Sequence, residues 1–195
     1  TSLLIAITDK TGLITYHGPV GYSSWKDFST EQVMNTLAGG LPFTMKNPSF
    51  HLKELATLTT GKATGQLIGG NLTVVTSMIG TQHEPDWKNK ILFLEETGEE
   101  PYRIDRLLWQ LKQADVFKQI NGVILGAFTK CEAEEPAKSF SLNDILNQHF
   151  KNKKYPVYKG AAFGHIVPKF TLPIGLNVEI DADNFTITLL ERSVI

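Results

Sequence analysis

The sequence is poor in cysteine and has almost no excess charge. Cys131 is the single cysteine among 195 residues, which excludes an internal disulfide and any zinc site built from several cysteines. We interpret it as an ordinary loop thiol. The 19 Lys and Arg residues and 20 Asp and Glu residues leave a net charge of −1. Proteins that bind nucleic acid by neutralising phosphates usually carry excess positive charge, so we expect no nucleic-acid partner.

Long apolar runs and an export signal are also missing. The longest apolar runs, such as Ile91–Leu94 and Gly122–Phe128, fall far short of the ~20 residues that a membrane helix needs, so we expect no membrane partner. The first ten residues lack the basic start and the cleavage site of a signal peptide. The single cysteine fits a reducing compartment, and we expect a cytoplasmic location. The chain also lacks an initiator Met, and we therefore expect it to begin inside a longer polypeptide.

The apolar spacing and turn residues that are present predict an α/β chain. A buried strand, an amphipathic helix and a second buried strand follow one another from residue 91 to residue 128, a βαβ order that implies parallel pairing. We predict helices over 3–10, from Thr30 to Gly39, over 72–79, from Pro101 and from Ser141 to Phe150. We predict strands over 13–17, 91–96, 122–128 and 155–158, a hairpin over 178–190, a loop over 42–50, and weak β-structure around a turn at 61–65 that ends at Gly69.

Two carboxylates, Glu95 and Glu96, end the predicted strand over residues 91–96. The carboxyl ends of parallel strands face the crevice where ligands bind, so these two are stronger catalytic candidates than carboxylates on a helix surface. Successive side chains of a strand point to opposite faces, so only one of the two can face a given site. The alternative is an ordinary strand-end carboxylate paired with Lys or Arg.

His165 is the main candidate for a general base. It follows Gly164 in a loop, and a glycine allows close approach of backbone or ligand while loop geometry aims the imidazole. A structural histidine is the alternative interpretation, and His17 at the end of a predicted strand has the same two interpretations. We interpret the remaining histidines as surface residues: His51, His83 and His149.

The glycine-rich segments give weaker signals. Backbone N–H groups at residues 69–71 could hold a carboxylate or phosphate, which makes Gly70 and Asn71 candidates for substrate binding. The segment lacks the lysine of a phosphate-binding loop, and no three-glycine dinucleotide motif follows a strand. Ser23 and Ser24 follow Gly21 without the second glycine of a nucleophile elbow, so we interpret them as ordinary loop serines.

Several strings together resemble the LD-carboxypeptidase family. These are serine peptidases that remove the terminal D-alanine from murein tetrapeptide in peptidoglycan recycling, and a sister branch contains microcin C self-immunity peptidases. The strings occur in family order over nearly the whole chain, and their combination is specific. They lie at Thr11–Pro19, Gly69–Leu72, Ile91–Glu96, Gly98–Leu108, Gly164–His165 and Thr171–Gly175.

The resemblance implies a serine, histidine and glutamate triad without a metal or other cofactor, in which His165 is the base and Glu95 the acid. The triad serine is expected in a Gly-Tyr-Ser-Asp string upstream of Thr1, so the chain alone is expected to be inactive. Residues 13–195 resemble the swivelling β/β/α C-terminal domain of the family. Residues 1–12 would be a helix left from a missing flavodoxin-like N-terminal domain, and we also expect a homodimer.

Two other functions remain open at the level of sequence. His17, Glu95 and His165 could form the two-histidine, one-carboxylate site of a metal hydrolase, although no HExxH helix is present. Alternatively, the chain could be a stand-alone peptide-recognition or assembly module, because a domain without its partner exposes an apolar face that favours association.

Overall fold

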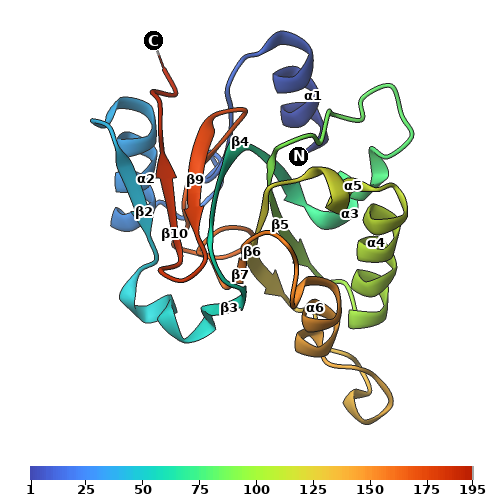
Figure 1. Cartoon of the computed structure of the whole chain (residues 1–195). Helices are drawn as coiled ribbons and strands as arrows, with labels where there is room; N and C mark the ends of the chain where they lie inside the picture. Colours follow the sequence, from blue (N-terminus) through green and yellow to red (C-terminus); the bar gives the residue numbers. More distant parts are fainter. Residues whose placement is uncertain (195) are drawn as a thin grey trace.

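Four parallel strands form the centre of a mixed eight-stranded sheet in the computed structural model, which describes residues 1–194 (Figure 1). Residue 195, the last of the expected C-terminal domain, lies outside the described residues. The parallel strands are β4 (Lys62–Asn71), β5 (Ile91–Thr97), β6 (Gly122–Thr129) and β7 (Val157–Lys159). The α/β class and the parallel pairing of β5 with β6 are therefore confirmed.

Antiparallel strands extend this sheet at both edges. The complete order is β2-β10-β9-β4-β5-β6-β7-β3. The added strands are β2 (Phe43–Lys46), β3 (Ala56–Thr59), β9 (Asn177–Asp181) and β10 (Thr186–Leu189). A separate two-stranded sheet joins β1 (Thr15–His17) to β8 (Leu172–Ile174). The predicted closing hairpin corresponds to β9 and β10.

The four α-helices that follow β4 lie together on one side of the parallel strands (Figure 1). They are α3 (Leu72–Ser77), α4 (Pro101–Gln113), α5 (Val116–Gln119) and α6 (Leu142–Phe150). The two earlier helices are α1 (Ser2–Thr11) and α2 (Asp27–Ala38), and short 3-10 turns are η1 (Ser49–Glu54) and η2 (Pro136–Lys138). Within residues 1–194 no helix is long and apolar enough to cross a membrane.

Local sequence explains the two best-predicted helices. Pro101 occupies the first turn of α4, where no backbone N–H is needed, and Ile104, Leu108 and Leu111 on one face are fully buried. Ser141 caps α6 in a reciprocal capping box with Asp144. Both helices therefore begin at the predicted residues and present an apolar face to the core.

The core lies between the sheet and these helices. The apolar residues of β5 and β6, Ile91–Leu94 and Val123–Leu125, have no exposed surface, as expected for strands covered on both faces. Ile5 of α1 is also fully buried in this core, and Gly12 ends that helix in the left-handed conformation. The boundary that separates residues 1–12 from residues 13–195 remains a prediction.

Three predicted segments differ from the structure. Helix α2 begins at Asp27 instead of being capped by Thr30, and the predicted loop over 42–50 contains the edge strand β2. Strand β4 runs through residues 62–71, where a turn at 61–65 and a break from Gly69 were expected. The reason is packing: a Cβ atom on Gly69 would lie 1.9 Å from the carbonyl oxygen of Phe93. Glycine here permits close strand approach and does not end the strand.

Candidate active site

The two glutamates at the end of β5 are both buried and have different surroundings. Glu95 is 1% exposed and Glu96 is 2% exposed. The register between β5 and β6 shifts between Leu94 and Glu96. The Glu96 carboxylate accepts hydrogen bonds from the Thr73 backbone N–H (2.8 Å), the Thr73 hydroxyl (2.7 Å) and the Asn71 amide (2.6 Å). Glu96 thus stabilises the junction between β4 and α3, which leaves Glu95 as the candidate for chemistry.

Glu95 is paired with His165 across 70 residues of sequence. The distance from Nδ1 of His165 to Oε2 of Glu95 is 2.8 Å. The His165 side chain is 58% exposed, whereas the Glu95 side chain is 1% exposed. A buried carboxylate thus holds one edge of an imidazole that is otherwise accessible. The structure brings together the acid and the base that the sequence proposed, in the geometry in which a carboxylate fixes the histidine tautomer.

Gly164 is required for this contact. Its φ angle is +107°, and a Cβ atom at this position would lie 2.9 Å from both Cβ and Oε2 of Glu95. The backbone of the histidine loop therefore lies directly against the glutamate side chain. Two flanking hydrogen bonds fix the loop: Ala127 N–H donates to the Phe163 carbonyl (2.9 Å), and Lys169 N–H donates to the Ser29 hydroxyl (2.9 Å).

One positive charge, that of Lys169, acts on the buried carboxylate of Glu95. Oε1 of Glu95 is buried and has no hydrogen-bond partner among the described residues. The Glu95 carboxylate raises the pKa of the half-buried Lys169, although the larger effect of burial lowers it. Lys169 was not predicted, because its only sequence signal is its position four residues after His165. Its ammonium group partly balances the buried negative charge.

His17 lies beside this pair as a neutral aromatic side chain. Its ring packs edge-on against Phe93 (centroids 5.4 Å apart) and Phe163 (6.5 Å). The pKa of His17 is lowered from 6.5 to about 4, first by burial and then by positive charges that include the Thr1 amino group and His165. His17 is therefore uncharged near neutral pH.

This geometry does not favour the metal-hydrolase alternative. Among residues 1–194, no three His, Cys, Asp or Glu side chains come together in a group that could hold a metal ion. His17, Glu95 and His165 are neighbours, but the His17 ring packs against two phenylalanines and only His165 is hydrogen-bonded to Glu95. The three residues proposed as metal ligands therefore do not form a ligand set.

The predicted substrate-binding residues lie on the strand beside Glu95. Asn71 is the register partner of Glu95 in the parallel pair of β4 and β5. Its side chain caps α3 by accepting the Val74 N–H and donates to Glu96, and its backbone N–H donates to the Thr1 hydroxyl at 3.1 Å. Asn71 thus has structural partners for all these groups. Gly70 precedes it with a φ angle of +147°.

Two histidines interpreted as surface residues are not simply exposed. His149 is 3% exposed, and its Nε2 atom lies 2.7 Å from Oδ1 of Asp105, so α6 is joined to α4. Burial lowers the pKa of His149 despite the nearby carboxylate. His51 is half-buried, and its Nε2 atom is buried without a partner among residues 1–194. His83 is exposed, as expected.

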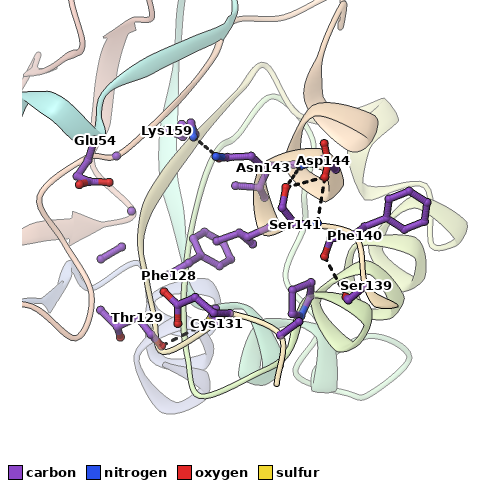
Figure 2. Close-up of a pocket in the computed structure, with 18 of the residues that line it drawn as sticks. Glu54, Phe128, Thr129, Cys131, Ser139, Phe140, Ser141, Asn143, Asp144 and Lys159 are labelled. Carbon is purple, nitrogen blue, oxygen red and sulfur yellow. Dashed lines mark hydrogen bonds between the residues drawn. The ribbon is translucent and has the colours of Figure 1, made fainter. Parts of the chain in front are cut away.

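A cavity that the sequence did not predict reaches the residue that follows His165. It has a volume of about 840 Å³ and lies at the carboxyl ends of β6 and β7 (Figure 2). Ile166, the residue after His165, lies on its wall, as does Cys131. Cys131 is buried, which raises the pKa of its thiol, so it is not an activated nucleophile. Ligands of such sheets bind at the carboxyl ends of parallel strands, and β6 ends beside β5, so this rule could have indicated the position of the cavity.

Comparison with known proteins identifies the domain to which these residues belong. Residues 64–180 match the LD-carboxypeptidase C-terminal domain. The chain is 35% identical over 179 residues to the Bacillus subtilis protein named "Probable murein peptide carboxypeptidase", and 30% identical over 221 residues to the microcin C7 self-immunity protein of Escherichia coli. These alignments cover 90% and 98% of this chain, but only 55% and 63% of the two relatives.

A solved structure gives the same result for the fold. The crystal structure of muramoyltetrapeptide carboxypeptidase from Oxalobacter formigenes superimposes with a TM-score of 0.82 at 26% sequence identity. The superposition covers 96% of this chain and 64% of that one. The matched domain, the relatives and the shared fold together show that the chain belongs to the LD-carboxypeptidase family and contains its C-terminal domain.

Proposed function

We propose that this chain supplies the base and the acid of a serine carboxypeptidase that removes the terminal D-alanine from murein tetrapeptide. The observation that carries the proposal is the hydrogen bond between accessible His165 and buried Glu95. Relatives named for murein peptides make such a peptide the first substrate to test. A microcin-type substrate is the alternative within the same family.

The geometry suits general base and acid catalysis by His165. Nδ1–H of the imidazole donates to Glu95, which leaves Nε2 to accept the proton of a serine hydroxyl as it attacks the carbonyl before D-alanine. The same Nε2 then donates the proton to the leaving amine. Glu95 fixes the tautomer and stabilises the imidazolium that forms between these two steps.

The nucleophilic serine is placed outside these 195 residues. Among residues 1–194, the hydrogen bond of the His165 imidazole goes to Glu95 and no serine hydroxyl contacts it. The curated relatives are also much longer than the aligned region. Loss of the nucleophile from a triad costs on the order of 10⁶ in turnover, so the chain alone is expected to be inactive.

Gly70 and Asn71 remain the proposed contacts for the peptide substrate. They lie on β4 immediately beside the end of β5, so a peptide bound next to Glu95 and His165 would pass close to them. The Asn71 side chain is held by Glu96 and the α3 cap, and its backbone N–H by the Thr1 hydroxyl, so the backbone of Gly70 is the proposed main contact.

Release of D-alanine from murein tetrapeptide tests the proposed activity. The purified chain should give no release above its His165→Ala variant. The chain joined to the serine-bearing N-terminal part of the Bacillus subtilis relative should release D-alanine, and His165→Ala in this fusion should abolish the release. Hydrolysis by the chain alone, above the His165→Ala control, would refute the missing-nucleophile proposal.

The proposed cellular setting is peptide recycling in the cytoplasm, by a homodimer. Large apolar side chains are exposed on the N-terminal part of the chain, among them Leu3, Leu13, Val20 and Tyr22. The same exposed residues favour the second candidate function, a peptide-recognition or assembly module. Sedimentation velocity separates these outcomes: a monomer at high concentration would argue against both the homodimer and an assembly module. Binding of D-alanine-terminated peptide without turnover by the fusion would favour recognition.

A further inference from the structure

Helix α2 buries a polar face, whereas helices usually turn an apolar face towards the core. The residues of α2 that are buried are Ser29, Gln32 and Thr36. They lie at positions i, i+3 and i+7, so they share one side of the helix. Two large apolar residues of the same helix, Met34 and Leu37, are exposed instead. Burial of polar side chains is unfavourable unless they are hydrogen-bonded, so this face is expected to have partners.

The partners of this polar face lie just after His165 in the chain. The Ser29 hydroxyl accepts a hydrogen bond from the Lys169 backbone N–H at 2.9 Å. Two turns further along α2, the Thr36 hydroxyl donates to the Thr171 carbonyl at 3.2 Å. Thr171 is buried and directly precedes strand β8. Two hydroxyl groups of one helix thus hold the two ends of a three-residue backbone segment.

The loop that carries the proposed base is fixed at its two ends. Among residues 1–194, no backbone–backbone hydrogen bond involves the loop itself, residues 164–168. Before the loop, the Phe163 carbonyl accepts a hydrogen bond from β6. After the loop, the N–H of Lys169 donates to α2, and the N–H of Phe170 donates to the Ala162 carbonyl at 2.7 Å. A change at either end is therefore expected to move the imidazole relative to its acid.

A charged side chain extends from the same anchored backbone. Lys169 is half-buried, and burial lowers its pKa, whereas the Glu95 carboxylate raises it. The ammonium group therefore lies close enough to act on the buried acid. Because the Ser29 hydroxyl holds the Lys169 backbone, α2 fixes the origin of this charge as well as the end of the loop.

We propose that Ser29 and Thr36 are positioning residues, whose hydroxyl groups fix the segment after His165 and so hold the imidazole in contact with Glu95. This inference rests on the proposed function, because that function makes His165 the base. Both hydroxyls act through the backbone of the segment, so they are not expected to contact the peptide. Their loss should lower kcat and leave KM unchanged. A misplacement of about 1 Å can cost on the order of 10²-fold in rate.

Substitutions that remove one hydroxyl test the positioning role in the 195-residue chain. Ser29→Ala and Thr36→Val each take away the side-chain partner of a backbone group. Imidazole ¹⁵N resonances report whether Nδ1–H of His165 still donates to Glu95. We expect both variants to weaken this hydrogen bond. Thr36→Ser, which keeps the hydroxyl, should retain it.

Two control variants separate these hydroxyls from a general loss of packing. Gln32→Met changes the middle residue of the same buried face, whose Oε1 atom has no hydrogen-bond partner among residues 1–194. Thr59→Val removes a hydroxyl that donates to the Phe150 carbonyl and accepts the Lys153 N–H, on a strand three places from β5 in the sheet. Both controls should leave the His165 resonances unchanged. An equal change in either control, or unchanged resonances in Ser29→Ala and Thr36→Val, would overturn the proposal.

Kinetics of the serine-bearing fusion separate this proposal from the proposed function. Ser29→Ala in the fusion should lower kcat for D-alanine release about 10- to 100-fold, with KM unchanged. An unchanged kcat in an active fusion would contradict the positioning role and leave the peptidase function intact. Changes of the His165 resonances confined to Ser29→Ala and Thr36→Val, without any D-alanine release by the unsubstituted fusion, would support the positioning role and contradict the peptidase function.

Discussion

Replacement of Gly164 by alanine should separate the histidine from its acid. The φ angle of +107° disfavours any residue with a Cβ, at a cost of about 1–2 kcal/mol. The new Cβ would also lie 2.9 Å from Oε2 and Cβ of Glu95, and overpacking of this kind costs typically 1–3 kcal/mol. We therefore expect Gly164→Ala to lower the free energy of unfolding by about 2–5 kcal/mol and to displace Glu95 from His165.

Gly12→Ala is the matched control for backbone strain. Gly12 has a φ angle of +73°, but a Cβ atom there would have nothing within 4 Å. Urea unfolding of both variants gives the difference, which should be about 1–3 kcal/mol in favour of Gly12→Ala. Imidazole ¹⁵N resonances should also show that His165 loses its Nδ1–H hydrogen bond only in Gly164→Ala. Equal destabilisation and unchanged His165 resonances would refute the argument that Gly164 is needed for the pair.

Three further predictions concern groups around the site. Because the pKa of His17 is lowered to about 4, its neutral side chain contributes fully to the free energy of unfolding above pH 6.5. This contribution falls by ~2–3 kcal/mol as the pH falls to 4. Urea unfolding of His17→Phe should therefore show a weaker decline over the same pH range. Glu96→Gln should lower the free energy of unfolding in urea by ~1–3 kcal/mol, because its new amide would face the N–H donors of Asn71 and Thr73. An unchanged free energy of unfolding would argue against a structural role for Glu96. Ser141→Ala should cost about 1 kcal/mol in thermal unfolding through loss of the α6 capping box, and a loss equal to that of Ser139→Ala would contradict this.

Sequence patterns predicted the elements whose signals are local. The spacing of Ile104, Leu108 and Leu111 predicted α4, and the capping residue Ser141 predicted the start of α6. The glycines of β4 were interpreted as a break, whereas Gly69 packs closely against β5, a contact that only the tertiary structure shows. Strand β2 was missed because it is a short edge strand whose partner, β10, lies about 140 residues later.

The pairing of Glu95 with His165 was predictable only in part. Strand-end reasoning selected Glu95 and Glu96 without deciding between them, and the family resemblance identified Glu95. The structure adds the physical reason, since Glu96 is occupied by the β4–α3 junction and Glu95 by His165. The pairing of His149 with Asp105 had no sequence signal, because the two residues are 44 positions apart on different helices.

Glu95 and His165 are proposed to be the acid and base of a peptidase whose serine lies outside this chain. D-alanine release from murein tetrapeptide measures it directly, with the chain alone and with the chain joined to a serine-bearing N-terminal part. We expect no release by the chain alone, release by the fusion, and a loss of activity on the order of 10³–10⁶ in the fusion when His165 is replaced by alanine. Release by the chain alone above its His165→Ala variant, or a fusion that keeps its activity without His165, would contradict it.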